Sequence, residues 1–186
     1  GAYYHLLNSL PPGPRERAES AFRNKNLVSS GFDPTAIAYH VTPDGLAGNR
    51  GSYDLILSRA VLEHVNDLEA TMRDIKRNLK PGGLSIHKVD LKSHGLDRQT
   101  DFDFLTRRPL VYRLMYSHKG CPNRWRVNKY RELADKVGLR LRTLTPTGRL
   151  PADKVQRIYP AAAHQYGNIS PDELSWLGFW MTLEHA

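Results

Sequence analysis

The sequence has almost no thiol chemistry and no segment suited to anchoring it in a membrane. Cys121 is the only cysteine in 186 residues, so no internal disulfide can form and no zinc-ligand spacing exists. No run of about 18 apolar residues occurs, which excludes a membrane-spanning helix. The first residues also lack the basic head and apolar stretch of a secretory signal. We therefore expect a cytoplasmic protein with no membrane partner.

Acidic side chains are scarce in one segment. Residues 107–157 contain 14 lysines and arginines but only three acidic residues, a net charge of +11, and the whole chain carries +8, which leaves −3 for the rest. Such a segment can attract an acidic partner such as nucleic acid. A solvated basic face with no partner has the same composition, so both interpretations stay open.

What is present suits one ordinary globular domain, with 40% hydrophobic and 25% charged residues. A helix is predicted over 13–25, from Pro14 in its first turn and small apolar residues at helical spacing. Residues 36–41 form a short apolar run typical of a strand, and the turn residues at 42–45 end it.

The most informative stretch predicts a strand, a helix and a second strand. Residues 53–58 are a compact apolar run, as expected of a strand buried on both faces. Apolar residues then recur every three or four positions up to Leu79, which predicts an amphipathic helix, and Asp67 can cap its start. The Lys-Pro-Gly-Gly sequence at 80–83 ends the helix, and 84–91 form the next strand. Such a βαβ unit implies a parallel sheet with a right-handed connection.

The rest of the chain predicts helices and two more strands. Helices are expected near 108–117 and over 127–137, and a strand over 139–144. A capping box at 170–173 begins another helix, and a last strand is expected over 178–183. Because a helical excursion separates the last two strands, a tight hairpin between them is not expected.

Residues 53–91 resemble the fourth strand, the following helix and the fifth strand of class I S-adenosylmethionine-dependent methyltransferases, in the manner of methyltransferase type 11. The residues that carry this resemblance are Asp54 at the start of the strand, Leu-Glu-His-Val at 62–65 and Leu-Lys-Pro-Gly-Gly at 79–83. Two such motifs at this spacing, inside one βαβ unit, are specific. The resemblance continues more weakly towards the end of the chain.

The resemblance implies an α/β fold: an incomplete Rossmann-like methyltransferase sheet with strands 3, 4, 5, 7 and 6, the last strand antiparallel. It covers residues 32–186, with 36–41 as the third strand, and leaves 1–31 as an N-terminal helical segment. The first two strands, the glycine-rich turn and the acidic residue that holds the ribose have no counterpart, and no G-x-G occurs in the chain. We therefore expect a truncated chain whose fourth strand has a bare edge, covered by residues 1–31 or by another chain in a homo-oligomer.

The same resemblance implies S-adenosylmethionine as the cofactor. Asp44 and Gly45 fall where the adenine lies in the family, with Asp44 accepting from its amino group, although Pro-Asp-Gly is equally an ordinary turn. Ser58, Arg59 and Ala60 fall at the carboxyl end of the fourth strand, where ligands bind in open α/β sheets. Their backbone would face the methionine part of the cofactor.

Three histidines and one aspartate are candidates for substrate chemistry. His64, within Leu-Glu-His-Val, could accept a proton from a substrate hydroxyl near neutral pH, or could serve as a hydrogen-bonding group at the start of the helix. His87, Asp90 and His94 flank the carboxyl end of the fifth strand and could line a substrate pocket. They share no tight ligand spacing, so no metal site is predicted.

Three functions follow from these observations. The first is an enzyme that transfers a methyl group from S-adenosylmethionine to a small-molecule acceptor, and the intact motifs favour it. The second is a methyltransferase-like binding or assembly module without catalysis. The third is a nucleic-acid methyltransferase that uses residues 107–157. The sulfonium is already a reactive methyl donor, so the protein mainly aligns the two reactants, and the sequence indicates the reaction without naming the acceptor.

Overall fold

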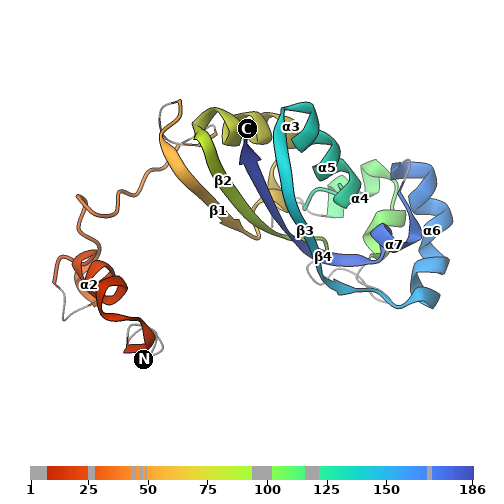
Figure 1. The fold of residues 1–186 in the computed structure, drawn as a ribbon. Coiled ribbons are helices and arrows are strands. Elements are labelled where there is room, and N and C mark those ends of the chain that lie inside the picture. Colours follow the sequence, from red (N-terminus) through yellow and green to blue (C-terminus); the bar gives the residue numbers. More distant parts are fainter. Residues whose placement is uncertain are drawn as a thin grey trace. The chain divides into compact units, whose positions relative to one another are not determined.

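The computed structural model describes residues 8–24, 28–42, 45–46, 48, 50–93, 102–115, 122–166 and 169–186. The chain divides into two units, Gly1–Pro43 and Asp44–Ala186 (Figure 1). The boundary predicted after residue 31 falls inside the first unit. None of the helices in the described ranges combines the length and apolar character that crossing a lipid bilayer requires.

The first unit is a short helix followed by a return of the chain. Helix α2 spans Pro12–Ser20 and the 3-10 helix η1 spans Val28–Ser30. The helix predicted over 13–25 ends early because Phe22 pairs with Phe32 in an antiparallel bridge, and their rings lie 5.2 Å apart. A long-range contact therefore replaces the last turn of the predicted helix.

The strand predicted over 36–41 is wrong. Residues 37–42 have no ladder partner in the part of the chain that the structure describes, and the side chains of Tyr39 and Val41 are 89% and 81% exposed. A short apolar run favours an extended backbone, but a strand also needs a neighbour to take its backbone hydrogen bonds.

The second unit contains a four-stranded sheet. Its strands are β1 (Tyr53–Arg59), β2 (Leu79–Asp90), β3 (Leu139–Arg149) and β4 (Trp176–His185), and their order is β1-β2-β4-β3. β1 and β2 are parallel, and β4 is antiparallel to both of its neighbours. The predicted α/β class with an antiparallel last strand is confirmed.

The predicted βαβ unit is present. Between β1 and β2 lies α3 (Leu68–Asn78), and Asp67 caps it by accepting a hydrogen bond from the Ala70 backbone N–H at 2.9 Å. The apolar side of α3 is buried, including Leu68 and Met72. The cap and the apolar spacing read from the sequence thus position this helix on the sheet.

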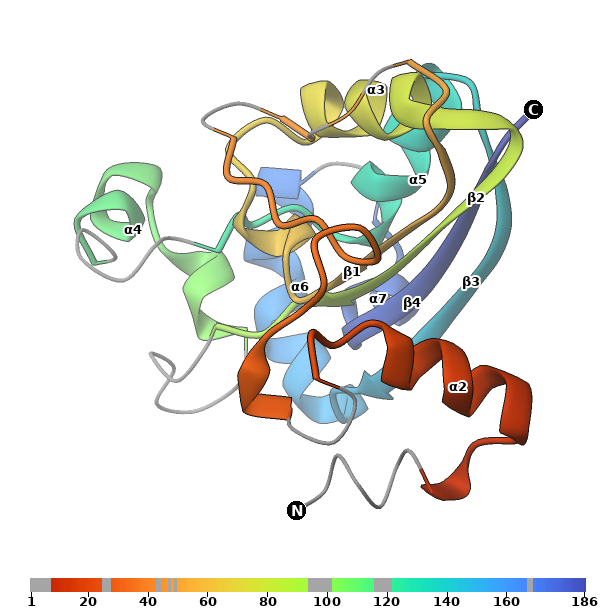
Figure 2. The ribbon, with the colours of Figure 1, turned by 90° about the vertical axis from the view of Figure 1, so that its left-hand side faces the viewer.

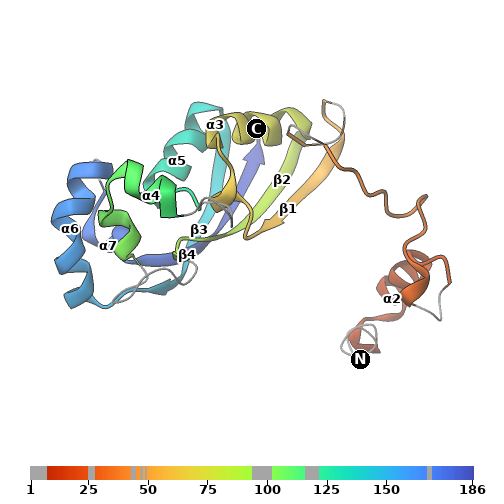
Figure 3. The ribbon, with the colours of Figure 1, turned by 180° about the vertical axis from the view of Figure 1, so that it is seen from behind.

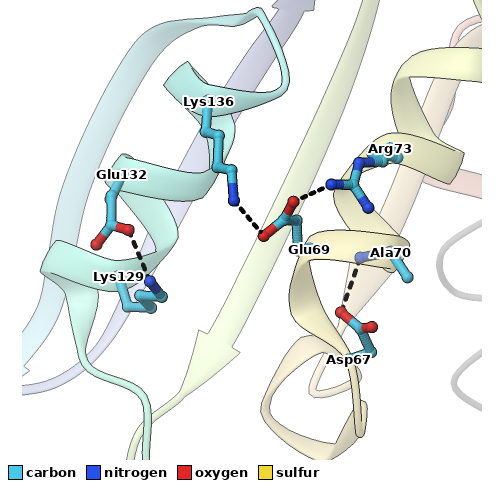
Figure 4. Close-up of polar contacts among 7 residues, drawn as sticks. All are labelled: Asp67, Glu69, Ala70, Arg73, Lys129, Glu132 and Lys136. Carbon is cyan, nitrogen blue, oxygen red and sulfur yellow. Dashed lines mark hydrogen bonds and ion pairs between the residues drawn. The ribbon is translucent and has the colours of Figure 1, made fainter.

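Helix α5 (Val127–Lys136) lies beside α3 and is tied to it by charge. Lys136 Nζ is 2.8 Å from the Glu69 carboxylate on α3, which also pairs with Arg73 one turn along its own helix (Figure 4). α5 ends at Lys136, and two residues later Gly138 has a φ of 75°, the left-handed conformation that closes a helix. The end of this helix was predicted correctly.

The excursion predicted between the last two strands is also present. Helices α6 (Ala152–Tyr166) and α7 (Pro171–Leu174) connect β3 to β4, and the Ser170 hydroxyl accepts from the Glu173 N–H at 3.2 Å, as a capping box requires. The other helices described in the unit are η2 (Leu62–His64), η3 (Asp103–Thr106) and α4 (Pro109–Met115).

The two faces of the sheet differ. Figure 2 shows α3 and α5 on one side of the strands. Alternate side chains of β2 and β4 are buried, as expected of the face that helices cover: Ser85, His87, Val89, Phe179, Met181 and Leu183. On the other face Leu55 is 48% and Leu57 is 65% exposed. The prediction that residues 53–58 are buried on both faces is wrong, because no described helix of this unit packs on the second face.

Candidate functional site

β1 ends in a backbone conformation that non-glycine residues rarely adopt. Ala60, directly after the strand, has a φ of 54°, and no other non-glycine residue in the described ranges has a positive φ. This conformation costs an L-residue roughly 1–2 kcal/mol. The Ala60 N–H donates to the Lys88 carbonyl at 2.9 Å, which fixes the turn to β2. Strained backbone of this kind concentrates at functional sites, and here it lies within the predicted Ser58–Ala60 segment.

Residues 58–65, which comprise the last two residues of β1 and the turn that follows them, are called the turn after β1 below. Groups from far along the chain hold this segment. Asn123 donates from Nδ2 to the Leu62 carbonyl at 2.8 Å and from its backbone N–H to the Glu63 carbonyl at 2.5 Å. The hydroxyl of Tyr130, on α5, donates to the Leu62 carbonyl at 3.3 Å. Burial raises the pKa of Tyr130 above its usual range, so the hydroxyl stays a donor. No sequence signal pointed to either residue, because their partners lie about 60 residues away.

Glu63 is the most unusual side chain of this turn. It is only 1% exposed, and neither carboxylate oxygen makes a hydrogen bond with the described residues. Burial raises the pKa of Glu63, partly offset by nearby backbone N–H groups and by His64. A buried carboxylate without a partner is costly unless it is neutralised or meets a cation or a hydrogen-bond donor. From sequence we expected Glu63 to be a helix-terminus group, so its burial was missed.

Ser58 and His87 form a direct contact between β1 and β2. They are register partners, and the Ser58 Oγ lies 2.7 Å from His87 Nδ1. His87 is 1% exposed, its Nε2 has no hydrogen-bond partner, and burial lowers its pKa to about 4. The imidazole is therefore neutral at physiological pH, and among the described residues its one polar partner is the hydroxyl of a predicted site residue.

The predicted substrate-pocket residues do not converge. His87 and Asp90 are three positions apart on β2, so their side chains leave opposite faces of the sheet. The side chain of His64 is exposed, at the end of η2. His94 lies outside the described residues. The structure thus joins His87 to Ser58 and separates it from Asp90.

Gly45 lies near the opposite end of β1. The Leu46 N–H donates to Asp74 at 2.8 Å, in the half of α3 that adjoins the start of β1. A strand of this length is about 20 Å long. The structure therefore does not bring Gly45 together with Ser58–Ala60, and Asp44 lies outside the described residues.

The carboxyl end of β2 is secured by a buried arginine that sequence analysis did not identify. Arg126 is 1% exposed and donates to the Leu91 carbonyl at 2.9 Å and to the Trp176 carbonyl at 3.0 Å. Its guanidinium lies 4.3 Å from the centroid of the Phe102 ring. Donation to two carbonyls and stacking on an aromatic ring fix the end of β2, the start of β4 and Phe102 together.

Comparison with known protein families identifies the family of this chain. Residues 10–144 match the family described as "Methyltransferase domain", which is 135 of 186 residues. The chain therefore belongs to the methyltransferase domain family, and the resemblance seen at 53–91 is confirmed. No curated protein matches the chain.

Solved structures give a consistent but partial likeness. One described as a sarcosine dimethylglycine methyltransferase from Galdieria sulphuraria is 17% identical, with a TM-score of 0.43, and the match covers 75% of this chain and 55% of that one. An S-adenosylmethionine-dependent methyltransferase from Mesorhizobium loti gives 15% identity, a TM-score of 0.46 and coverages of 75% and 65%. One from Methanosarcina mazei is 13% identical, with a TM-score of 0.47, and the match covers 75% of this chain and 62% of that one. The chain thus spans between half and two thirds of these proteins.

S-adenosylmethionine, on which the proteins from Mesorhizobium loti and Methanosarcina mazei are described as dependent, fits the described residues of this chain at one end only. The buried Glu63 carboxylate, without a hydrogen-bond partner, suits the positively charged sulfonium or ammonium of the methionine part. The Ser58 hydroxyl and the strained Ala60 backbone belong to the same turn. In the described ranges no glycine-rich turn or acidic residue is placed to hold the ribose, so the fit is limited to the methionine end.

Proposed function

We propose that this chain acts in the transfer of a methyl group from S-adenosylmethionine to a small-molecule acceptor. The observation that carries the proposal is the segment 58–65 of a chain of the methyltransferase domain family, which contains both the strained Ala60 backbone and the buried Glu63 carboxylate. Open α/β sheets bind ligands at the carboxyl ends of their strands, and this turn is such an end.

Glu63 is the group that would recognise the cofactor's positive charge. A buried carboxylate without a hydrogen-bond partner among the described residues is destabilised, and a cationic ligand beside it would stabilise its charge. A methyl donor with a sulfonium is such a ligand, whereas the product that remains after methyl transfer has lost that charge. Glu63 would thus bind the donor more tightly than the spent cofactor.

The other residues of the turn would hold the two reactants in position and would take no part in the reaction themselves. S-adenosylmethionine supplies an activated methyl group when it is bound. Asn123 and Tyr130 hold the backbone of residues 62 and 63, and Lys88 holds Ala60, so the turn is fixed before a ligand arrives. Rigid placement of this kind lowers the entropic cost of aligning the acceptor with the methyl group.

His64 remains the candidate for accepting the acceptor's proton. Its side chain is exposed and it directly follows Glu63, so a small acceptor could reach it from solvent. A general base is needed only when the acceptor must lose a proton. An acceptor amine that is already neutral would not require His64.

The proposal is tested by calorimetric titration of the chain with S-adenosylmethionine and with S-adenosylhomocysteine, which lacks the sulfonium charge. We expect both to bind, and Glu63→Gln to weaken S-adenosylmethionine by roughly tenfold or more, with a smaller effect on S-adenosylhomocysteine. Glu132→Gln is the matched control, because Glu132 is exposed and pairs only with Lys129 in the contacts shown in Figure 4. Absence of binding by the unmodified chain would favour a methyltransferase-like binding module without catalysis.

The nucleic-acid alternative is weakened by the ion pairs of the basic segment. Many of its cations face carboxylates from outside the segment: Arg131 pairs with Glu173, Lys136 with Glu69, Arg140 and Arg142 with Glu184, Arg149 with Asp172 and Arg157 with Asp103. Ion pairs within the fold thus neutralise part of the positive charge of residues 107–157. Binding to nucleic acid that falls steeply with salt concentration would restore this alternative.

A further inference from the structure

The Ser58–His87 contact leaves one question of polarity open, namely which of the two groups donates. The Ser58 Oγ and His87 Nδ1 are 2.7 Å apart, and a single hydrogen bond fits this distance. Each group can donate or accept, because the hydroxyl carries one proton and the neutral ring carries its proton on either nitrogen. The arrangement around the other ring nitrogen decides between the two.

His87 Nε2 is buried and has no hydrogen-bond partner in the part of the chain that the structure describes. If the ring carried its proton there, a buried N–H would be left without an acceptor, which native structures rarely tolerate. If the proton is on Nδ1, that N–H donates to Ser58 and Nε2 is left as an acceptor without a donor, which is the less costly defect. The surroundings of Nε2 therefore favour the tautomer with the proton on Nδ1.

Besides its two neutral tautomers, the His87 ring could carry both protons as an imidazolium, but it does not do so at neutral pH. Its register partner on β4 is Met181, and the strand neighbours on its own face are Ser85 and Val89, so no carboxylate faces it on the sheet. Burial lowers the pKa of His87 to about 4, which keeps the ring uncharged over the range in which the protein would work. His87 is thus a fixed neutral donor.

We propose that His87 is a positioning residue that donates from Nδ1 to Ser58, so that the Ser58 hydroxyl turns its own proton towards a ligand oxygen at the carboxyl end of β1. Ser58 then serves as a hydrogen-bond donor suited to a carboxylate or carbonyl group. The ligand half of this inference rests on the proposed function, and the tautomer half does not. Ser58 is half-buried and lies one residue before the end of β1, at the carboxyl end where open α/β sheets bind ligands.

The tautomer is tested directly by nitrogen NMR of the full chain labelled with ¹⁵N-histidine at pH 7. The His87 signals are assigned by their loss in His87→Asn. We expect the chemical shifts of a ring protonated on Nδ1. A ring protonated on Nε2 would overturn the inference, because Ser58 would then donate to His87 and have no proton for a ligand.

The ligand half is tested by calorimetry with S-adenosylhomocysteine. Ser58→Ala and His87→Leu should each weaken binding by ~5- to 10-fold, and the double variant should lose no more than either alone. His87→Asn places an amide N–H near the position of Nδ1 and should bind within about twofold of the unmodified chain. Circular dichroism verifies that each variant is folded.

Additive losses in the double variant, or an Asn variant as weak as the Leu variant, would contradict the coupling. If the unmodified chain fails to bind S-adenosylhomocysteine, the proposed function and the ligand half fall together. The NMR measurement still decides the tautomer in that case, so the two failures are distinguishable.

Discussion

The two faces of the sheet in the second unit are built from the same strands and have opposite characters. Phe179 and Met181 of β4 are completely buried beneath the helices, while Trp180 between them is 44% exposed on the other face. Figure 3 shows the sheet from behind, with the helices of this unit grouped on one side. Successive side chains of β4 thus point to opposite faces of the sheet, and the described helices of this unit pack against only one of these faces.

The difference between the two faces separates the proposed ligand-binding residues from the exposed apolar residues of β1. Ser58 and His87 belong to the covered face, where burial fixes rotamers and shifts the histidine pKa. Leu55 and Leu57 belong to the uncovered face of β1, which is also one of the two edge strands of the sheet. Parallel strands are normally covered on both faces and unpaired edges invite partners. A homo-oligomer that covers β1 therefore stays a prediction.

The largest effect should come from two adjacent residues on opposite faces. Phe179→Ala removes a fully buried ring and should lower the free energy of unfolding by about 3–5 kcal/mol. Trp180→Ala, next to it on the uncovered face, should cost less than about 1 kcal/mol. Urea denaturation of both variants gives the comparison. An equal loss at Trp180 would show that this face is covered in solution.

The second effect is a dependence of folding stability on pH, which arises from His87 on the covered face. The pKa of His87 is lowered from 6.5 to about 4 on folding, so the folded state binds the proton less readily than the unfolded state. Its contribution is fully present above pH 6.5 and is lost as the pH falls towards 4, by about 3 kcal/mol in total. Stability curves of the unmodified chain and of His87→Leu measure the difference.

The control for this slope is His64→Gln, because the His64 side chain is exposed. The Gln variant should keep the decline between pH 6.5 and 4, whereas His87→Leu should lose it. A decline that survives in His87→Leu would assign the acid sensitivity to other groups.

A smaller effect concerns the helix that covers β1 and β2. Asp67→Ala removes the side chain that accepts from the Ala70 N–H at the start of α3, and should cost about 1 kcal/mol. Asp67→Asn retains an acceptor and should cost less. Thermal denaturation compares the pair, and equal losses would mean that the cap contributes through its charge rather than its hydrogen bond.

The smallest effect should be a gain. Ala60 has a left-handed backbone, so Ala60→Gly relieves strain and should raise stability by about 0.5–1 kcal/mol, after allowance for the more flexible unfolded chain. Ala161→Gly, at an exposed position inside helix α6, is the matched control and should lose stability by a similar amount. A loss in Ala60→Gly would indicate that the Ala60 methyl group makes contacts that outweigh the strain.

Much of the second unit could be predicted from the sequence because its signals are local. The Asp67 cap, the apolar spacing of α3, the glycine after α5 and the capping box at Ser170 each lie within a few residues of the structure they specify. The family motifs between 53 and 91 then fixed the order of two strands and the expected cofactor. The antiparallel last strand followed from the same resemblance.

What the sequence could not show depends on contacts across the fold. The absence of a strand at 36–41 and the exposure of Leu57 reflect missing neighbours, which periodicity does not report. The burial of Glu63 depends on packing of distant residues around the turn after β1. Sequence position also grouped His87 with Asp90, although the alternation of β2 separates their side chains and leads His87 to Ser58.

The central claim is that the turn after β1 receives the methionine end of the cofactor. The most direct measurement is a titration of the full chain with S-adenosylmethionine, followed by the backbone amide signals in two-dimensional NMR. The account predicts progressive shifts at Ser58, Ala60 and Glu63, with Trp180 on the uncovered face unaffected. Saturable shifts confined to residues outside this turn, such as the groove of about 770 Å³ that Arg131 and Arg140 help to line, would contradict it.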